Sequence, residues 1–296
     1  MKKTIFTGAG VAIVTPFNKD GSINFDLLGE IIEYQIANGT DAVIICGTTG
    51  ESPTLTHEEH TAAIDYAVKK VNGRIPVIAG TGSNDTDYAV KLSQEAEKSG
   101  ADALLLVTPY YNKTSQQGLI RHYYYIADRV NLPMILYNVP SRTGVNIKPE
   151  TYLELSKHPN IVAAKEANGD ISALAKTIAL CGDNLDIYSG NDDQITAFLS
   201  LGAKGVISVL SNVAPKVAHD IVASFHEGDA KKSRKLQLEY LRLCNDLFID
   251  VNPIPVKEAM VMMGWDVGEC RMPLAPLSDS ARNTLKETLK HYGLVK

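Results

Sequence analysis

A lysine lies in a part of the chain that otherwise looks like a buried strand. The stretch IVAAKEA, residues 161–167, is apolar except for Lys165 and Glu166. Taking an ammonium group out of water is costly unless the group is paired or loses its proton. An amine without its extra proton is the nucleophile that attacks a carbonyl carbon. The stretch therefore has two interpretations, a nucleophilic lysine or an ion pair, for example with Glu166.

Two other segments carry groups that suit a substrate with a carboxylate. GTTGES places Thr48 and Thr49 between glycines, where consecutive backbone N–H groups can hold such a group. The same segment could be only a tight turn with Ser52 as a local cap. YNVPSRTG supplies Tyr137 and Arg142, and an arginine can grip a carboxylate through two parallel hydrogen bonds. The plainer interpretation of this arginine is a surface ion pair.

Short apolar runs alternate with amphipathic stretches along most of the chain. Each run is rich in Val, Ile, Leu or Ala without strict alternation, which is typical of parallel strands covered on both faces. The runs are residues 9–16, 41–48, 75–81, 101–109, 133–140, 161–167, 185–190 and 205–210. Eight such strands predict a (β/α)₈ TIM barrel, with an open doubly wound sheet as the alternative. In a barrel of this kind the active site lies at the carboxyl ends of the strands, where the polar groups gather.

Helical patterns fill the segments between the runs and continue to the end of the chain. Thr56 and Glu59 have the spacing of a capping box at one helix start. The expected helices among the strands cover residues 25–39, 56–71, 93–100, 115–130 and 170–180. No linker composition interrupts the first part of the chain. We therefore expect a catalytic barrel over residues 1–226 and a C-terminal helical region, an appendage to the barrel, over residues 227–296.

Charge, cysteines and histidines narrow the functional class. A formal net charge of −5 gives no electrostatic basis for binding nucleic acid. Four widely spaced cysteines without a C-x-x-C pair indicate reduced thiols, and the start of the chain lacks a continuous apolar run. A cytoplasmic protein without a membrane span is expected. His57 and His60 lie three residues apart, but no third ligand follows at metal spacing, so no metal site is predicted.

Five motifs occur together along the chain: GTTGES, TPYYNK, YNVPSRTG, the lysine of VAAKEA, and SGNDD. In this combination the chain resembles the dihydrodipicolinate synthase family, within the pyruvate-dependent class I aldolases of the N-acetylneuraminate lyase superfamily. The resemblance covers essentially the whole chain, including NPIPVK at residues 252–257. It implies a lyase of the diaminopimelate and lysine biosynthesis pathway. The substrates would be pyruvate and L-aspartate 4-semialdehyde, with no metal or organic cofactor.

The resemblance also implies roles for individual residues. Lys165 would form a Schiff base with pyruvate, and Tyr137 would relay protons above it. Thr48 would link two tyrosines in a proton relay, and one of these, Tyr111, would reach into the active site of a neighbouring subunit. The positions implied to bind substrate are Thr49 for the pyruvate carboxylate, Arg142 for the carboxylate of the second substrate, and Gly190 and Ile207 as lining of the pyruvate pocket.

A relay that crosses between subunits implies a homo-oligomer, commonly a tetramer built as a dimer of dimers. Some family members also bind lysine as a feedback inhibitor at the dimer interface. The positions matching that effector site are Ser52, His57, His60, Asn84, Tyr88 and Tyr110. Tyr88 departs from the pattern, because lysine-sensitive members tend to carry a glutamate there. Since a missing carboxylate removes a partner for the ammonium group of lysine, we expect weak or absent inhibition.

Two alternatives remain open at this point. Sugar-acid lyases, of the N-acetylneuraminate or 2-keto-3-deoxy acid type, share Lys165, Tyr137 and the GTTGE turn. Arg142 favours a small aldehyde with a carboxylate over a polyhydroxylated chain. A non-catalytic barrel that binds a keto acid is disfavoured, because such a protein would be expected to lose the nucleophile or the relay residues, and Lys165, Tyr137, Thr48 and Tyr111 are all present.

Overall fold

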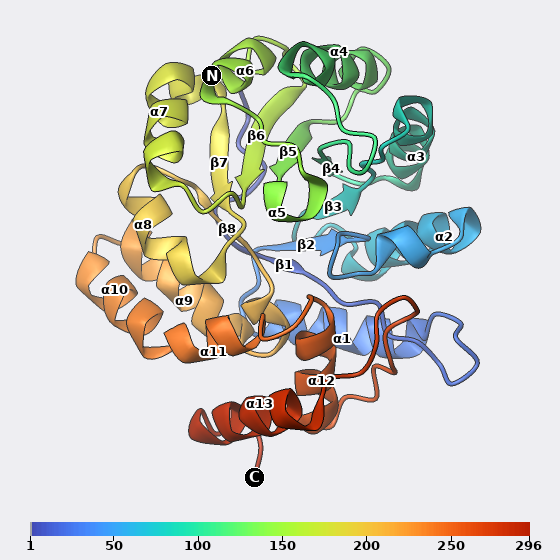
Figure 1. The fold of residues 1–296 in the computed structure, drawn as a ribbon, viewed down its shortest axis with the longest axis vertical. Coiled ribbons are helices and arrows are strands. Elements are labelled where there is room, and N and C mark those ends of the chain that lie inside the picture. Colours follow the sequence, from blue (N-terminus) through green and yellow to red (C-terminus); the bar gives the residue numbers. More distant parts are fainter. Residues whose placement is uncertain (1) are drawn as a thin grey trace.

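The computed structural model describes residues 2–296 and contains a closed barrel of eight parallel strands (Figure 1). Each strand pairs with the next along the chain, and the last pairs with the first. The strands are β1 (Gly8–Ala12), β2 (Ala42–Ile45), β3 (Val77–Gly80), β4 (Ala103–Val107), β5 (Met134–Asn138), β6 (Ile161–Glu166), β7 (Asp186–Ser189) and β8 (Gly205–Ser208). The predicted (β/α)₈ fold is confirmed, and the open sheet is excluded.

Apolar side chains fill both faces of the barrel wall, which explains why the strands lack strict alternation. One cluster lies inside the barrel and includes Ile44, Ile78, Leu105 and Ile135. A second, larger cluster lies between the strands and the surrounding helices. The strands are shorter than the apolar runs because several runs continue into the loops that follow. These loops carry the candidate site.

Helices surround the strands on all sides (Figure 1). They are α1 (Phe25–Ala37), α2 (His57–Val71), α3 (Thr86–Ser99), α4 (Gln116–Ala127), the short α5 (Pro140–Thr143), α6 (Pro149–Leu155), α7 (Ile171–Cys181), α8 (Ile195–Ser200) and α9 (Pro215–His226). The capping box at Thr56 and Glu59 is present. Helix α3 begins well before the predicted residue 93, because the Asp85 side chain caps the N–H groups of Asp87 and Tyr88.

The C-terminal region forms four more helices that pack against the barrel. They are α10 (Ala230–Glu239), α11 (Leu241–Asp246), α12 (Ile254–Met262) and α13 (Asp279–His291). Helices α12 and α13 lie outside α1 (Figure 1), and Trp265 packs its ring 5.3 Å from that of Tyr34 on α1. Helix α10 packs against α9, so the expected boundary at residue 226 falls between two helices in contact. The division into these two units stays a prediction.

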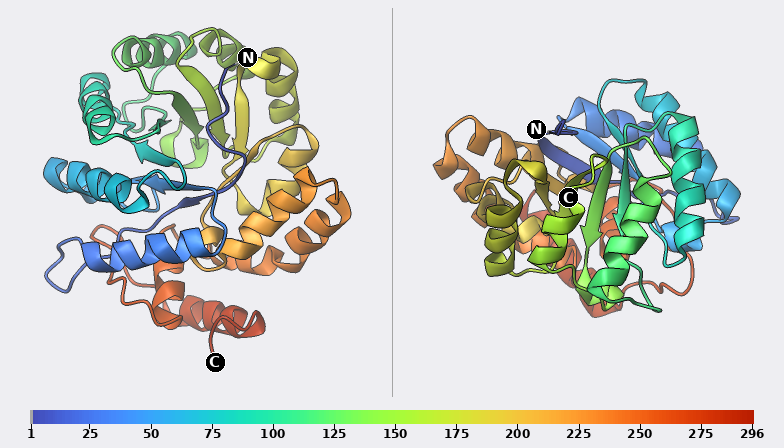
Figure 2. Two further views of the ribbon diagram at one scale, coloured as in Figure 1. Left: turned by 180° about the vertical axis from the view of Figure 1, so that it is seen from behind. Right: turned by 90° about the horizontal axis from the view of Figure 1, so that it is seen from above.

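The N-terminal segment crosses the end of the barrel opposite the site loops (Figure 2, left). Phe6 stacks on Tyr188 of β7 with ring centroids 4.4 Å apart. All four cysteines are unpaired, and three of them are buried. Across residues 2–296, none of the helices combines the length and the apolar content that a membrane span requires.

Candidate active site

Lys165 and Tyr137 lie side by side on neighbouring strands. They are paired in the register of β5 and β6, so both side chains leave the wall on the same face. The Lys165 Nζ atom is 4.3 Å from the centre of the Tyr137 ring. Lys165 is 5% exposed and Tyr137 is 7% exposed. The structure thus brings together the predicted nucleophile and the predicted proton-relay residue at the carboxyl end of the barrel.

Glu166 points the opposite way and does not pair with the lysine. Its carboxylate accepts hydrogen bonds from the Asn138 side chain at 2.9 and 3.0 Å, from the Tyr152 hydroxyl at 2.8 Å and from the Asn168 N–H at 2.9 Å. Burial raises the pKa of Glu166 to about 7, although these donors act against the rise. No ion pair joins Glu166 to Lys165 within residues 2–296. The ion-pair interpretation of the sequence is wrong, which leaves the nucleophile.

Gly190 lies next to the lysine, and Ile207 belongs to the apolar cluster inside the barrel. Gly190 follows β7, and a Cβ atom there would lie 3.2 Å from Lys165 Cε and 2.8 Å from Ala167 Cβ. Only glycine leaves the lysine stem this room. Ile207, on β8, is fully buried in the inner apolar cluster that also contains Tyr137. This apolar wall isolates the lysine from bulk water.

The GTTGES turn takes its partners from distant parts of the chain. Thr49 is buried, and its hydroxyl oxygen accepts a hydrogen bond from Asn252 Nδ2 at 3.0 Å. Glu51 adopts a left-handed conformation with φ of 56° and forms a buried ion pair with Lys257 at 2.9 Å. Thr48 is half-buried. The turn is therefore held in shape by the C-terminal region, and its two threonines are at the mouth of the barrel.

Arg142 lies on α5, in the loop after β5, and is exposed. Its Nη2 atom donates to the Asn252 carbonyl at 3.1 Å. Arg142 and Thr48 both line a cavity of 370 Å³ at the mouth, together with apolar groups such as Val107 and Val139. No ion pair involves Arg142 among residues 2–296, so the surface ion-pair interpretation is wrong for the described part of the chain.

Tyr111 is not among the residues that line the cavity shared by Thr48 and Arg142. It is 91% exposed, and its backbone has a φ of 68°, which is unusual for a residue other than glycine. Residues with backbone conformations of this kind cluster at functional sites. The ring is available to a second molecule rather than to Lys165 of the same chain.

A family model described as the dihydrodipicolinate synthetase family matches residues 5–292. The chain belongs to this family. It is 55% identical over 295 residues to the 4-hydroxy-tetrahydrodipicolinate synthase of Acetivibrio thermocellus, and 100% of each chain is covered. The crystal structure of the chloride-inhibited dihydrodipicolinate synthase from Acinetobacter baumannii, complexed with pyruvate, has a TM-score of 0.96 and 44% identity, with 99% of this chain and 100% of that chain covered. A lysine-bound structure from Cyanidioschyzon merolae has a TM-score of 0.96 and 37% identity, over 99% of this chain and 100% of that chain.

The effector positions suggested by the family resemblance do not all lie together. Ser52, His60, Tyr88 and Tyr110 line the same 370 Å³ cavity as Arg142. His57 lies beside this cavity. It contacts the Tyr88 hydroxyl at 3.4 Å and Glu95 at 3.2 Å. Asn84 lines a separate hollow of 520 Å³ next to the loop that carries Tyr111. Within one chain, four of the six effector positions therefore share a cavity, and His57 and Asn84 lie outside it.

His60 is held in a neutral form by its surroundings. Its Nε2 atom contacts the Gly80 carbonyl at 2.9 Å, and burial lowers the pKa of His60 to about 4. Its Nδ1 atom is buried without a hydrogen-bond partner in the described residues.

The structure adds site residues that sequence reasoning missed. Asp192, in SGNDD, is buried and accepts the N–H groups of Val209 and Leu210 at 2.9 and 2.8 Å. Burial raises the pKa of Asp192, and the nearby charge of Lys165 opposes the rise. Asn252 and Lys257 lie in NPIPVK and hold the Thr49 and Glu51 side chains. The only signal for these three residues in the sequence is a polar side chain inside a family motif, SGNDD for Asp192 and NPIPVK for the other two.

Proposed function

We propose that this chain is a 4-hydroxy-tetrahydrodipicolinate synthase that condenses pyruvate with L-aspartate 4-semialdehyde. One observation carries the proposal: a buried lysine that forms no ion pair within residues 2–296 lies 4.3 Å from a tyrosine ring at the carboxyl end of the barrel. The family membership and the names of its relatives support the same reaction. Imine formation requires a nucleophilic amine, and Lys165 supplies one that is 5% exposed beside the Tyr137 ring.

The first half of the reaction activates pyruvate. The Lys165 amine attacks the keto carbon, and the oxygen of that carbon leaves as water, which forms an imine. The imine withdraws electrons from the methyl group, so that this group loses a proton and an enamine results. The Tyr137 hydroxyl would exchange these protons, and Thr49 would hold the pyruvate carboxylate. Gly190 gives the lysine stem room for the covalent intermediate.

The second half forms a carbon–carbon bond. The enamine carbon attacks the aldehyde carbon of L-aspartate 4-semialdehyde, whose oxygen takes up a proton. The amino group of the bound aldehyde then replaces Lys165 at the imine carbon, which closes the ring and frees the lysine. Arg142 would bind the carboxylate of the second substrate, since it lines the cavity at the mouth. No organic cofactor is required, because the covalent imine on Lys165 serves as the electron sink.

The proton relay needs a second copy of the chain. Tyr111 is 91% exposed, so its hydroxyl would act in the site of a neighbouring subunit, beside Thr48. This supports a homo-oligomer with a dimer as its smallest active unit. A Tyr111→Phe protein should stay assembled and lose most of its turnover. Full turnover in an assembled Tyr111→Phe protein would remove the relay from the mechanism.

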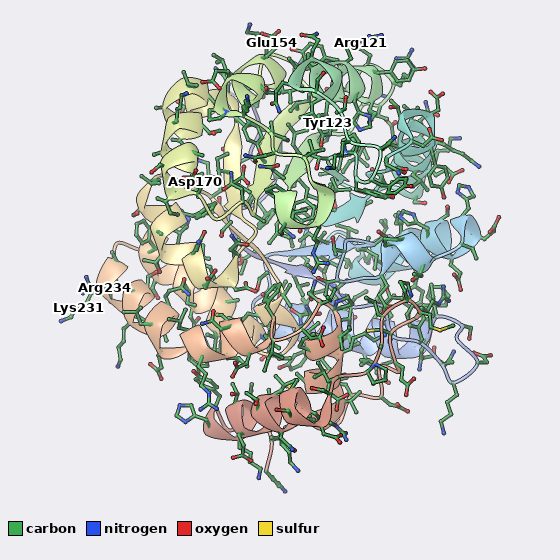
Figure 3. The ribbon with its side chains drawn as sticks, viewed as in Figure 1. Arg121, Tyr123, Glu154, Asp170, Lys231 and Arg234 are labelled. Carbon is green, nitrogen blue, oxygen red and sulfur yellow. The ribbon has the colours of Figure 1, made fainter. Side chains whose placement is uncertain are left out.

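Borohydride trapping tests the imine directly. Wild-type protein, treated with pyruvate and borohydride, should gain one pyruvate-derived group per chain in its intact mass. Lys165→Ala should gain none. Lys231→Ala is the matched control, because Lys231 is exposed on α10 and points outward (Figure 3), and it should react like wild type. Absence of an adduct on wild-type protein would overturn the proposal.

Turnover then separates the two candidate aldolases. An adduct together with turnover of L-aspartate 4-semialdehyde supports the synthase. An adduct without this turnover would favour a sugar-acid lyase, which would cleave or form a longer keto acid by the same imine. Arg142→Ala should raise the KM for the semialdehyde and leave trapping by pyruvate intact, because Arg142 is not part of the lysine's own surroundings.

A further inference from the structure

One residue of the C-terminal region contacts both loops that would bind substrate carboxylates. Asn252 lies between α11 and α12 and is 5% exposed. Its side-chain Nδ2 donates to Thr49 Oγ1 at 3.0 Å, and its backbone carbonyl accepts from Arg142 Nη2 at 3.1 Å. Asn252 thereby joins the loop after β2 to the loop after β5.

The bond from Asn252 leaves the Thr49 hydroxyl proton free for a ligand. A hydroxyl has one proton to donate and two lone pairs that accept. Asn252 occupies one lone pair, and no residue between 2 and 296 accepts the Thr49 proton. Donation into a hydroxyl also polarises it, which strengthens the hydrogen bond that it gives in turn. Asn252 therefore prepares Thr49 as a donor to a carboxylate.

Arg142 likewise uses only part of its hydrogen-bonding capacity within the chain. A guanidinium group has five N–H donors in a planar fork. Within residues 2–296, the Asn252 carbonyl is the single partner of this group, and the guanidinium also lines the cavity at the mouth. The bond restricts the orientation of the fork, while the remaining donors stay available to a second carboxylate.

The segment that carries Asn252 is anchored to the same turn at a second point. Lys257, on α12, pairs with Glu51 of GTTGES, and both side chains are 2% exposed. The Asn252 Oδ1 atom, by contrast, is buried without a partner in the described residues. An unpaired buried oxygen is costly, so packing alone would favour an apolar residue here. The asparagine side chain is therefore better explained by its contact to Thr49.

We propose that Asn252 is a positioning residue that sets the carboxylate-binding geometry of the mouth. It acts on the keto acid through Thr49, by its side chain, and on the second substrate through Arg142, by its backbone carbonyl. This inference rests on the proposed function and deepens it. It assigns a role in the reaction to a residue more than two hundred positions away from the turn that it orients.

Three variants test the side-chain contact. Asn252→Ala should raise the KM for pyruvate about tenfold, the equivalent of one net hydrogen bond. Its KM for the semialdehyde should change less, because the backbone carbonyl remains. Asn252→Asp should raise the KM for pyruvate about a hundredfold, since the new carboxylate takes the Thr49 proton and repels the substrate. Asn245→Ala, an exposed asparagine on α11, is the control and should behave as wild type.

The order of the two variants separates positioning from packing. Asparagine and aspartate have nearly the same shape, so a purely structural role predicts that Asn252→Asp is the milder change. That order, or an unchanged KM in Asn252→Ala, would overturn the inference. If the alanine variant does not fold, the near-isosteric aspartate variant carries the test alone, and an unchanged KM for pyruvate in it would overturn the inference. Adding Asn252→Ala to Thr49→Val should cost no further affinity for pyruvate, as a double-mutant cycle requires for an effect that acts through Thr49.

Trapping distinguishes a failure of this inference from a failure of the proposed function. At saturating pyruvate, wild-type and Asn252→Ala proteins should form the same borohydride adduct, because Lys165 is unchanged. No adduct on wild type would refute the imine mechanism itself. Adducts on both, with equal pyruvate dependence, would refute only the role of Asn252.

Discussion

Removing one partner of the buried ion pair between Lys257 and Glu51 should lower the free energy of unfolding substantially. Their charged atoms are 2.9 Å apart, and both side chains are 2% exposed. Lys257 Nζ also donates to the carbonyls of Thr15 and Glu269 at 3.3 and 3.0 Å. Lys257→Met would leave the Glu51 carboxylate buried, with the Arg271 N–H at 2.8 Å as its remaining hydrogen bond in the described residues.

Removing one partner of a buried ion pair costs about 3–5 kcal/mol, mostly because the other charge stays out of water. A protein of this size loses about 2 °C of Tm per kcal/mol, so Lys257→Met should melt about 6–10 °C below wild type. Lys257→Met combined with Glu51→Gln removes both charges and should regain most of this loss. Protomer concentration must be held constant, because assembly also stabilises the folded chain.

An exposed ion pair provides the matched comparison. Lys69 and Asp65 are 2.6 Å apart, and their side chains are 73% and 40% exposed. Lys69→Met should therefore change stability by less than about 1 kcal/mol. Trp265, the single tryptophan, reports by fluorescence on the C-terminal region, while circular dichroism reports on all helices. Equal Tm losses in Lys257→Met and Lys69→Met would refute the argument that burial decides the cost.

Three further predictions concern the site itself. The pKa of Glu166 is raised from 4.5 to about 7, so the native state keeps a proton that the unfolded chain loses between these pH values. The stability of wild type relative to Glu166→Gln should therefore fall by up to about 3 kcal/mol from pH 4.5 to 7. Urea unfolding at several pH values checks this, and a constant stability difference would contradict it. Gly190→Ala should reduce pyruvate trapping at least about tenfold and also lower Tm, because its methyl group would lie 3.2 Å from Lys165 Cε and 2.8 Å from Ala167 Cβ. Turnover should persist in millimolar L-lysine, because none of the described residues that line the 370 Å³ cavity is acidic. Tyr88→Glu should gain inhibition by L-lysine. Strong inhibition of wild type would overturn this prediction.

The part of the site that lies on strands was predictable from the sequence. Lys165 and Tyr137 each end an apolar run, and parallel strands bring such ends to one rim. The opposite direction of Glu166 also follows from strand alternation, since successive side chains point to opposite faces. Alternation is therefore a sufficient argument against an ion pair between Glu166 and Lys165. Periodicity and strand order were sufficient for these residues.

The contacts of the loops could not be predicted in the same way. Thr49 meets Asn252, and Glu51 meets Lys257, across about two hundred residues of chain. Such pairs leave no periodic pattern, because each depends on where the C-terminal helices pack. The early start of α3 was missed for a different reason. The capping role of Asp85 shows only in the hydrogen bonds that its side chain accepts from the Asp87 and Tyr88 N–H groups.

The C-terminal region has a function that the barrel itself cannot supply. The strand ladder fixes Lys165 opposite Tyr137, so the sheet itself sets the relative position of these two residues. The loops after β2 and β5 have no such ladder, and their polar groups need partners from elsewhere. Asn252 and Lys257 provide these partners from one short segment. Variation in that segment should therefore change which carboxylates bind, while imine formation at the lysine is preserved. In this chain the sheet therefore holds Lys165 and Tyr137, and the C-terminal segment holds the loops that carry Thr49 and Arg142.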